Sequence, residues 1–408
     1  MKKLLFVLSL TAIFFMSLCV GAFAQKSGEF GTIVSGELIF PAQEKHVHGS
    51  SVVELPNGDL LAVWFYGSGE RSSNDVELMG ARLPQGADRW TDVFPMADAP
   101  GVPDCNPVLF LNAEKKLFLT WITVLGNRWE TSILRVKTTV HYDGPEAPNW
   151  DWQDDIFFKP TDDFAAEVKA KIYDVDRPDG VSEEEFRKEL DGVVEMAENL
   201  VARSTGWMTR IPPIRLASGR ILLPLYSDGF NFSMIAISDD DGKTWHPSLP
   251  IVGRGIQPSL AVKKDGTIVA YMRKASHSKS KEAPRLWTAE SKDDGVTWTL
   301  SHRTEFPSEA SVDLFALADG RWIYVANDID SRHLLSMFVS DDEGETWRRA
   351  ETLEFDPTKQ NRYCYPCVIQ TQDGMLHITY SCHGKIDDKE SKSIKHIVID
   401  PEKIGKAR

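Results

Sequence analysis

The octapeptide SDDDGKTW, Ser238 to Trp245, decides the fold of this chain, because it recurs as SKDDGVTW at 291–298 and as SDDEGETW at 340–347. The common pattern is S-x-D-x-G-x-T-W. In such a turn the serine and threonine hydroxyls and the aspartate carboxylate hydrogen-bond nearby backbone groups, glycine permits the tight backbone, and tryptophan packs between neighbouring units. We therefore interpret each copy as the fixed turn of one repeated structural unit.

The spacing of the copies gives the size of the repeat. Their closing tryptophans are about 53 and 49 residues apart, close to the roughly 40 to 50 residues of a propeller blade. A second mark is a glycine inside an apolar hairpin, early in each unit, where the first two strands would turn. These glycines are Gly58, Gly219, Gly266, Gly320 and Gly374.

The two marks together divide the chain into six units. The units begin near Ser50, Asn106, Pro213, Pro258, Val312 and Pro366. The first two units have degenerate octapeptides, which end in Trp90 and in Trp150 or Trp152. A strand between Gly36 and Pro41 would complete the last unit and close the ring, which removes free sheet edges. We therefore predict an all-β fold, a six-bladed β-propeller.

The octapeptide resembles the Asp box of the sialidase-like β-propellers, which are also described as BNR-repeat proteins. The resemblance implies that each copy joins the two outer strands of a blade, on the face away from the active site. It covers nearly all of the chain after residue 24. The chain is most similar to the secreted bacterial members of this group that are often described as exo-α-sialidases.

The first residues have the pattern of a secretory signal peptide. Lys2 and Lys3 precede an apolar run from Leu4 to Val20, and the small residues up to Ala24 form an A-x-A cleavage site. A transmembrane anchor is the alternative, but the run is short and ends in small residues. We expect cleavage after Ala24, a single mature domain over 25–408 in the periplasm or outside the cell, and no membrane span in the mature chain.

Charge and cysteine content restrict the classes of partner. The 60 Asp and Glu residues outnumber the 46 Lys and Arg residues, which argues against a nucleic acid partner. Cys364 and Cys367 have C-x-x-C spacing, but they fall in a predicted strand and no second pair with zinc spacing accompanies them. We expect no metal or cofactor, and buried thiols at Cys105, Cys364, Cys367 and Cys382; a disulfide to Cys382 or Cys105 after export is the alternative.

The chain between 155 and 203 interrupts the rhythm of strands. Ser182 to Glu185 form a capping box, and apolar residues from Phe186 to Ala197 recur at helical spacing. We predict a helical insertion over about 160–205, between the second and third blades. Its charged face is either a solvated surface or part of a lid over the site, because insertions on one face of a propeller often shape its binding surface.

The resemblance also implies two substrate-binding arginines. Sialidases have an arginine in the middle of the chain, after a glutamate, and another before the last full Asp box. Arg273, in VAYMR, and Arg332, in SRHLLSMFVS, fall at these places. Two guanidiniums from adjacent blades would hold a sugar carboxylate by bidentate, charge-assisted hydrogen bonds; the alternative for either alone is a surface arginine.

Three further residues match the catalytic positions of sialidases by resemblance. Tyr365, in the last blade, falls where the sialidase tyrosine stands, and a phenol suits an anionic sugar that would repel a carboxylate nucleophile. Tyr363 is a second candidate, two residues away and so on the same strand face. Asp75 lies about where the acid or base aspartate would be. The alternatives are a core aromatic for Tyr365 and a turn former for Asp75.

Two departures from the sialidase pattern affect the expected chemistry. His48 stands where the early R-I-P motif would supply the first arginine, and Gln257 stands where the glutamate partner of the tyrosine would be. Glutamine cannot accept a proton from the phenol. A histidine that titrates near neutrality, a tyrosine and two arginines instead suit proton abstraction beside a neutralised carboxylate, and resemble the residue sets of propeller-fold uronate lyases.

Three functions follow as hypotheses. The first is a secreted exo-acting glycoside hydrolase of the sialidase superfamily, with an acidic or decorated glycan as substrate and sialic acid itself doubtful. The second is a polysaccharide lyase that cleaves beside a uronate. The third is a propeller that binds glycan without catalysis. Family resemblance favours the first, and the replacements at His48 and Gln257 favour the second.

Overall fold

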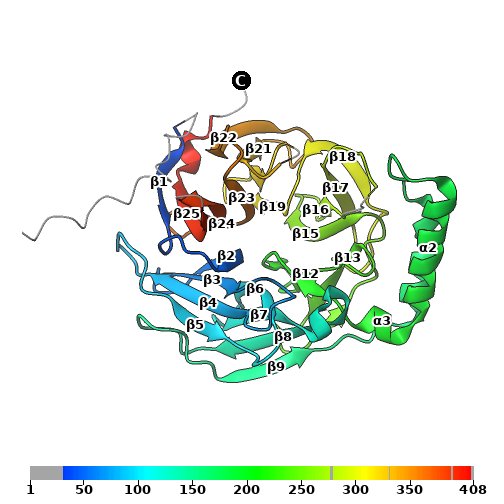
Figure 1. The fold of residues 1–408 in the computed structure, drawn as a ribbon, viewed down its shortest axis with the longest axis horizontal. Coiled ribbons are helices and arrows are strands. Elements are labelled where there is room, and N and C mark those ends of the chain that lie inside the picture. The colour runs from blue at the N-terminus through cyan, green and yellow to red at the C-terminus, as the bar shows by residue number, and fades with distance from the viewer. Residues whose placement is uncertain (1–30, 276–278, 330, 387–388, 406–408) are drawn as a thin grey trace, which may run out of the picture.

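The fold is a six-bladed β-propeller, as the repeated turns predicted (Figure 1). The computed structural model describes residues 31–275, 279–329, 331–386 and 389–405. Six antiparallel sheets stand around a central axis, and the inner strand of each sheet is the first of its unit. No helix in these described ranges is long and apolar enough to cross a membrane. The predicted signal peptide, 1–24, lies outside the described residues.

The first three blades contain the following strands. Blade 1 consists of β2 (His46–Glu54), β3 (Leu60–Gly67), β4 (Glu77–Leu83) and β5 (Phe94–Ala97). Blade 2 consists of β6 (Asp104–Leu111), β7 (Leu117–Val124), β8 (Ser132–Thr139) and β9 (Trp152–Ile156). Blade 3 consists of β10 (Met208–Thr209), β11 (Ile214–Arg215), β12 (Ile221–Ser227), β13 (Phe232–Ser238) and β14 (His246–Pro247).

The last three blades complete the ring. Blade 4 consists of β15 (Gly255–Val262), β16 (Ile268–Lys274), β17 (Arg285–Ser291) and β18 (His302–Pro307). Blade 5 consists of β19 (Asp313–Ala316), β20 (Trp322–Ala326), β21 (Leu334–Ser340) and β22 (Arg348–Phe355). Blade 6 consists of β23 (Arg362–Gln370), β24 (Leu376–Ile386), β25 (Lys389–Ile399) and β1 (Ile33–Leu38).

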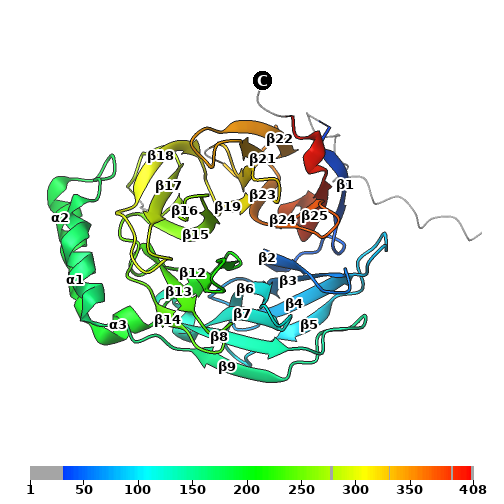
Figure 2. The same cartoon turned by 180° about the vertical axis from the view of Figure 1, so that it is seen from behind.

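The N-terminal strand closes the ring. β1 pairs antiparallel with β25, with Gly36 opposite Ile397, and so forms the outer strand of the last blade (Figures 1 and 2). The strand begins three residues before the predicted Gly36–Pro41 and ends at Leu38. Blade 6 therefore contains strands from both ends of the described chain. The pairing of β1 with β25 covers one edge of each strand that would otherwise be free.

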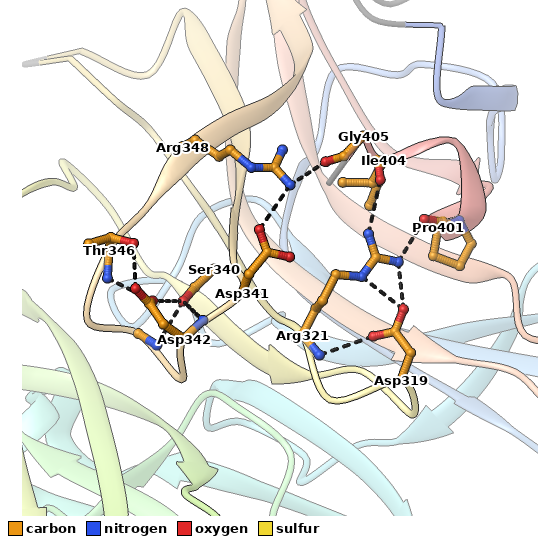
Figure 3. A network of polar contacts seen from close by, with 11 residues as sticks. Asp319, Arg321, Ser340, Asp341, Asp342, Thr346, Arg348, Pro401, Ile404 and Gly405 are labelled. Carbon is orange, nitrogen blue, oxygen red and sulfur yellow. Dashed lines mark hydrogen bonds and ion pairs between the residues drawn. The ribbon is translucent and has the colours of Figure 1, made fainter. Parts of the chain in front are cut away.

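The three Asp boxes have the same hydrogen bonds. In each, the threonine hydroxyl donates to the aspartate carboxylate at 2.6 Å, and the glycine N–H donates to the serine hydroxyl at 2.8 to 3.0 Å. Figure 3 shows the third copy, with Ser340, Asp342 and Thr346 around one turn. Each box joins the two outer strands of its blade, as the resemblance implied.

Each box also packs on the preceding blade. A Cβ built on Gly242 would lie 2.7 Å from Phe118, one on Gly295 would lie 3.0 Å from Leu222, and one on Gly344 would lie 3.2 Å from Tyr271. All three glycines have positive φ values of 84° to 91°. Glycine is thus required both by the backbone conformation and by the close approach of the neighbouring blade.

Four inner strands share a bulge near their first residues. The pairing of β2, β6, β15 and β23 with the next strand shifts register, and the bulged residue has a left-handed backbone. These residues are Gly49 (φ 63°), Asn106 (φ 52°), Gln257 (φ 58°) and Tyr365 (φ 61°). A bulge redirects a side chain, and a left-handed backbone at a non-glycine residue is a strained conformation that clusters at functional sites.

The bulges separate two ends of the central channel. Beyond them, the inner strands of all six blades line a largely apolar cavity of about 380 Å³. Because a strand advances along its axis with every residue, the side chains before and at the bulges face the opposite end. That end contains almost all of the predicted site residues.

Helices occupy the segment between blades 2 and 3. They are α1 (Asp162–Lys171), α2 (Glu183–Glu198) and α3 (Leu200–Ser204), with a 3-10 turn at Ile172–Asp174. Other 3-10 turns lie within blade 2, at Leu125–Asn127 and Trp129–Thr131, and after blade 6, at Pro401–Lys403. The Ser182 hydroxyl accepts a hydrogen bond from the Glu185 N–H, which caps α2. The helices lie outside the ring and not over its centre (Figures 1 and 2).

The four described cysteines, Cys105, Cys364, Cys367 and Cys382, are buried free thiols. Burial raises the pKa of each thiol above its ordinary value. The pair Cys364 and Cys367 flanks the bulge of β23. These cysteines are therefore part of the apolar interior, and they form no disulfide in the described chain.

Candidate active site

Tyr365 lies at the centre of the candidate site. Its side chain is 8% exposed, and the left-handed bulge of β23 directs it toward the channel. The ring centroid of His48 is 4.1 Å from that of Tyr365, and the guanidiniums of Arg210 and Arg332 lie 4.9 Å and 5.6 Å from it. Residues of blades 1, 3, 5 and 6 therefore meet at one phenol, and cation–π attraction favours this packing.

Gln257 connects the phenol to Arg273. The Gln257 Nε2 donates to the Tyr365 hydroxyl oxygen at 3.2 Å, and the Arg273 Nε donates to Gln257 Oε1 at 2.7 Å. The guanidinium fixes the orientation of the amide, because only Oε1 can accept from it. Gln257 therefore presents a donor, and not a base, to the phenol.

A second phenol extends this network. Tyr226, from β12, is buried and accepts a hydrogen bond from Asn106 Nδ2 at 3.0 Å. Burial raises the pKa of Tyr226 well above its ordinary value, and the nearby Asp228 and Tyr365 raise it further, against a hydrogen bond from Gln257. Two of the four bulged residues thus contact this neutral tyrosine.

His48 is neutral in this environment. Its Nδ1 lies 2.7 Å from the Ser381 hydroxyl, and the rings of His46 and His383 stand 5.7 Å and 5.4 Å away. Burial lowers the pKa of His48 well below its ordinary value, and the charges of His383 and Arg332 lower it further. The expectation that His48 titrates near neutrality is therefore wrong, because a desolvated imidazole beside other cations disfavours its charged form.

Arg210 was not predicted from the sequence. It is 1% exposed and lies in the break between β10 and β11. One terminal nitrogen donates to the Ser50 carbonyl at 3.2 Å and the other to the Pro366 carbonyl at 3.0 Å. Both carbonyls belong to bulged inner strands, so Arg210 holds the bulges of blades 1 and 6 in place beneath Tyr365.

Asp75 does not reach the site. Its exposed carboxylate accepts hydrogen bonds from the Ser68 hydroxyl at 2.6 Å and from the Ser68 N–H at 3.1 Å, which lower its pKa. It acts as a turn former. Glu70, from the same loop between β3 and β4, instead pairs with His46 Nε2 at 3.2 Å. His46, Arg332 and Arg71 lower the pKa of Glu70 against its burial.

Asp228 is a second carboxyl at this end of the channel. It follows β12 in the loop before β13. Burial raises the pKa of Asp228, and the carboxylates of Glu130 and Glu70 add to the rise, while Arg273 and Arg71 oppose it. The loops that follow the second strands of blades 1 to 3 thus bring acidic groups close to the arginines.

Tyr363 and Tyr365 lie in different parts of the core. Tyr363 packs in the core cluster of blades 5 and 6, and its N–H donates to the Arg332 carbonyl at 2.7 Å. Regular alternation would place the two rings on one face, but the positive φ of Tyr365 interrupts it. The two tyrosines therefore do not act together, although the Tyr363 backbone helps to hold Arg332.

The assembled site combines cations, a phenol and neutral hydrogen-bonding groups. Arg332 and Arg273 are the side chains suited to a carboxylate or other anion. No group of three or more His, Cys, Asp or Glu residues in the described ranges is arranged to hold a metal ion. The sequence signal for the missed residues was weak, because Glu70 and Asp228 lie in loops and Tyr226 lies on a second strand.

The comparisons agree with this architecture. Residues 202–378 match the model of the BNR repeat-like domain. A protein of unknown function from Dyadobacter fermentans DSM 18053 has a TM-score of 0.63 at 15% identity, over 90% of this chain and 98% of that chain. No curated protein matches the chain significantly.

Two trans-sialidase structures are also similar in fold. The leech intramolecular trans-sialidase has a TM-score of 0.62 at 13% identity, over 92% of this chain and 71% of that one. The intramolecular trans-sialidase from Ruminococcus gnavus has a TM-score of 0.62 at 13% identity, over 92% and 99%. The chain therefore has the six-bladed β-propeller fold of these trans-sialidase structures, and its residues 202–378 match the BNR repeat-like domain.

Proposed function

We propose that this protein is a carbohydrate-active enzyme, an exo-acting glycoside hydrolase whose substrate has an acidic or otherwise decorated terminal sugar. The convergence of Arg332, Gln257 and His48 on the Tyr365 phenol carries this proposal. Arg332 and Arg273 would hold the anionic group of the sugar. Tyr365 would then lie next to the anomeric carbon.

The site differs from that of a sialidase at two of the positions that would act on sialic acid. The phenol of Tyr365 has a donor, Gln257, where a sialidase would have a carboxylate, and His48 replaces one arginine of the clamp. A phenol without a base is a poor nucleophile. We therefore expect a sugar whose hydrolysis does not depend on ionised tyrosine.

A lyase is the second candidate, and one observation favours it. The neutral imidazole of His48 can accept a proton, and it stands 4.1 Å from the Tyr365 ring, between centroids. A base and a phenol beside two guanidiniums suit elimination next to a uronate carboxylate. The product of such a reaction would contain a new carbon–carbon double bond.

One experiment tests both candidates. The purified protein is incubated with sialosides, uronate-containing polysaccharides and rhamnosyl-uronate oligosaccharides, and reducing ends and double-bond absorbance are followed. New reducing ends without absorbance support hydrolysis, whereas absorbance supports the lyase. Binding to a member of the panel without either signal would leave a glycan-binding propeller and overturn both enzymatic proposals.

We also propose that the protein is exported and that its signal peptide is cleaved after Ala24. The charged, apolar and small residues of 1–24 support this proposal. N-terminal sequencing of the protein from the periplasm or the medium tests it. A chain that begins at Gln25 is the expected result, and an intact leader in the membrane fraction would contradict it.

A further inference from the structure

Asp228 differs from the other carboxyl groups at the site end of the channel. Glu70 pairs with His46 at 3.2 Å, and Glu130 pairs with Arg128 at 3.7 Å. Among the described residues, none hydrogen-bonds or pairs with the Asp228 side chain at these distances. Most buried polar groups in proteins have a hydrogen-bond partner. A half-buried carboxyl without a partner in the protein is therefore available to bind a substrate.

The surroundings place Asp228 next to the network of Tyr365. Tyr226, two residues before it, contacts Asn106 and Gln257. Gly229, directly after it, lies so close to Glu130 that a Cβ there would come within 3.1 Å of the Glu130 Cγ. The backbone of Asp228 is therefore held from both sides, by the inner network and by the loop of blade 2.

We infer that Asp228 is the general acid of this enzyme and that Glu70 is the base that works with it; the inference rests on the proposed glycoside hydrolysis. Because Gln257 leaves Tyr365 without a base, proton transfer needs another pair of groups. Glu70 lies 3.2 Å from His46, whose ring stands 5.7 Å from that of His48, and Asp228 closely follows Tyr226. The two carboxyls therefore flank the network of Tyr365, as an acid and a base of glycoside hydrolysis flank the bond that they cleave.

The electrostatics agree with these roles. Burial and the neighbouring carboxylates raise the pKa of Asp228, which favours a proton on it. His46, Arg332 and Arg71 lower the pKa of Glu70, which favours the carboxylate. The two groups also influence each other, since Glu70 is among the charges that raise the pKa of Asp228.

In the reaction, the proton of the Asp228 carboxyl moves to the glycosidic oxygen as the bond from that oxygen to the anomeric carbon breaks. The leaving group departs as a neutral alcohol, and Asp228 becomes a carboxylate. A water molecule adds to the anomeric carbon and loses a proton to Glu70. Glu70 then releases this proton to solvent and Asp228 takes one up from solvent, which restores both groups.

The test compares two substrates whose leaving groups differ in their need for a proton from a general acid. Methyl and dinitrophenyl glycosides of the sugar turned over in the panel are compared with wild type and Asp228→Asn. A general acid contributes about 10²- to 10⁴-fold, so the variant should lose that much kcat on the methyl glycoside. It should lose less than about tenfold on the dinitrophenyl glycoside, whose leaving group needs no proton. The alkaline limb of the wild-type pH profile should disappear with the variant.

A matched control and a binding-independent readout complete the design. Asp239→Asn changes an exposed aspartate at the opposite end of the same blade and should leave both rates unchanged. Carbon-13 NMR of aspartate carboxyls, wild type minus Asp228→Asn, should give a carboxyl that titrates above the ordinary pKa of about 3.9. Glu130→Gln should bring that titration closer to the ordinary value.

The outcomes separate the two proposals. Equal losses of kcat on both glycosides, or a carboxyl whose pKa is at or below its ordinary value, would overturn the role of Asp228. Turnover by the wild-type protein would in that case still support the hydrolase proposal. Wild-type protein that turns over no member of the panel would overturn the hydrolase and, with it, Asp228 as its acid.

Discussion

The Gln257 side-chain amide donates a hydrogen bond to the Tyr365 hydroxyl at 3.2 Å, while its oxygen accepts one from Arg273 at 2.7 Å. Both residues occupy the left-handed position of an inner-strand bulge, in blades 4 and 6. The same backbone device thus presents the two side chains to each other across the channel. The chemistry of the phenol depends on which atom of residue 257 faces it.

We expect Gln257→Glu to fold normally and to change the reaction. The carboxylate has nearly the same shape and would pair with Arg273, but its second oxygen would accept a hydrogen bond from the phenol. We expect turnover of the natural substrate to fall at least about tenfold, because the Tyr365 hydroxyl would then donate its hydrogen bond to the new carboxylate at position 257. Steady-state kinetics and a thermal melt check this prediction.

A sialoside provides the contrasting outcome for the same variant. If Gln257→Glu gains hydrolysis of a fluorogenic sialoside while wild type has none, the tyrosine–glutamate arrangement of sialidases is restored by one residue. If turnover of the natural substrate is unchanged, the amide has no part in the reaction and the assignment of this contact is wrong.

If Arg332 and Arg273 bind the anionic group of the substrate, the loss of kcat/KM on removing either guanidinium should increase with the charge of the substrate. Arg332 lies over the Tyr365 ring, and Arg273 binds Gln257. Removing one guanidinium by Arg332→Ala or Arg273→Ala should cost about 2 to 5 kcal/mol in kcat/KM for an anionic substrate. Arg332→Lys should recover only part of it, because ammonium lacks the bidentate geometry.

Arg303→Ala is the control for the clamp. Arg303 lies on the exposed outer strand of blade 4 and donates to the Ala283 carbonyl. Its removal should leave kcat/KM within about twofold, since an exposed pair contributes little. Equal kinetics of wild type and the double variant Arg273→Ala and Arg332→Ala would exclude these residues from the substrate site.

The fold was predictable because its signals are local. The three octapeptides and the hairpin glycines define turns whose hydrogen bonds lie within a few residues, so the sequence alone indicated blade number and strand order. Tyr365, Gln257 and His48 were also found, because they lie on inner strands in register with these turns. Their spacing along the chain reflects their position around the axis.

The rest of the site depends on conformations that no local pattern specifies. In the loop that contains Glu70 and Asp75, either acid could face the channel, and hydrogen bonds to Ser68 decide the matter for Asp75. The bulges separate Tyr363 from Tyr365 against the alternation of an ideal strand. One signal was present: a proline follows three of the bulged residues, Asn106, Gln257 and Tyr365.

The Asp-box tryptophans should differ in their contribution to stability. Trp298 is 3% exposed and donates to the Gly295 carbonyl at 3.0 Å, whereas Trp245 is only partly buried. Trp298→Ala should cost about 3 to 5 kcal/mol of unfolding free energy, and Trp245→Ala clearly less. Urea unfolding of both variants measures the difference. An equal or larger loss at Trp245 would contradict packing as the cause.

The last prediction concerns a buried carboxyl that joins three blades. Asp313, at the start of β19, accepts hydrogen bonds from the Ser259 hydroxyl at 2.9 Å and from the Val368 N–H at 2.7 Å. Burial raises the pKa of Asp313 to about 6, against these hydrogen bonds and the charge of Arg210. The folded state therefore binds a proton that the unfolded state, with an ordinary pKa of about 3.9, releases earlier.

The sign of the pH dependence follows from this difference. Between about pH 4 and pH 6 the folded state holds more protons than the unfolded state, so the contribution of Asp313 to stability is full below this range and falls as the pH rises through it. The loss should be on the order of 3 kcal/mol. Half-buried His377, with a pKa lowered to about 4, and buried His383, with a pKa lowered to about 3, act in the opposite direction. Whole-protein stability alone therefore does not isolate the effect.

Comparison with Asp313→Asn isolates it, because the variant has the same histidines and no titration at this site. The unfolding free energy of wild type minus that of Asp313→Asn should decrease by about 3 kcal/mol between pH 4 and pH 7. Ser259→Ala removes a hydrogen bond that favours the carboxylate, so it should extend the decrease to higher pH. Urea titrations at several pH values measure both. A difference that rises with pH would mean that the ionised form is favoured by folding, and that the hydrogen bonds from Ser259 and Val368 outweigh the cost of burying Asp313.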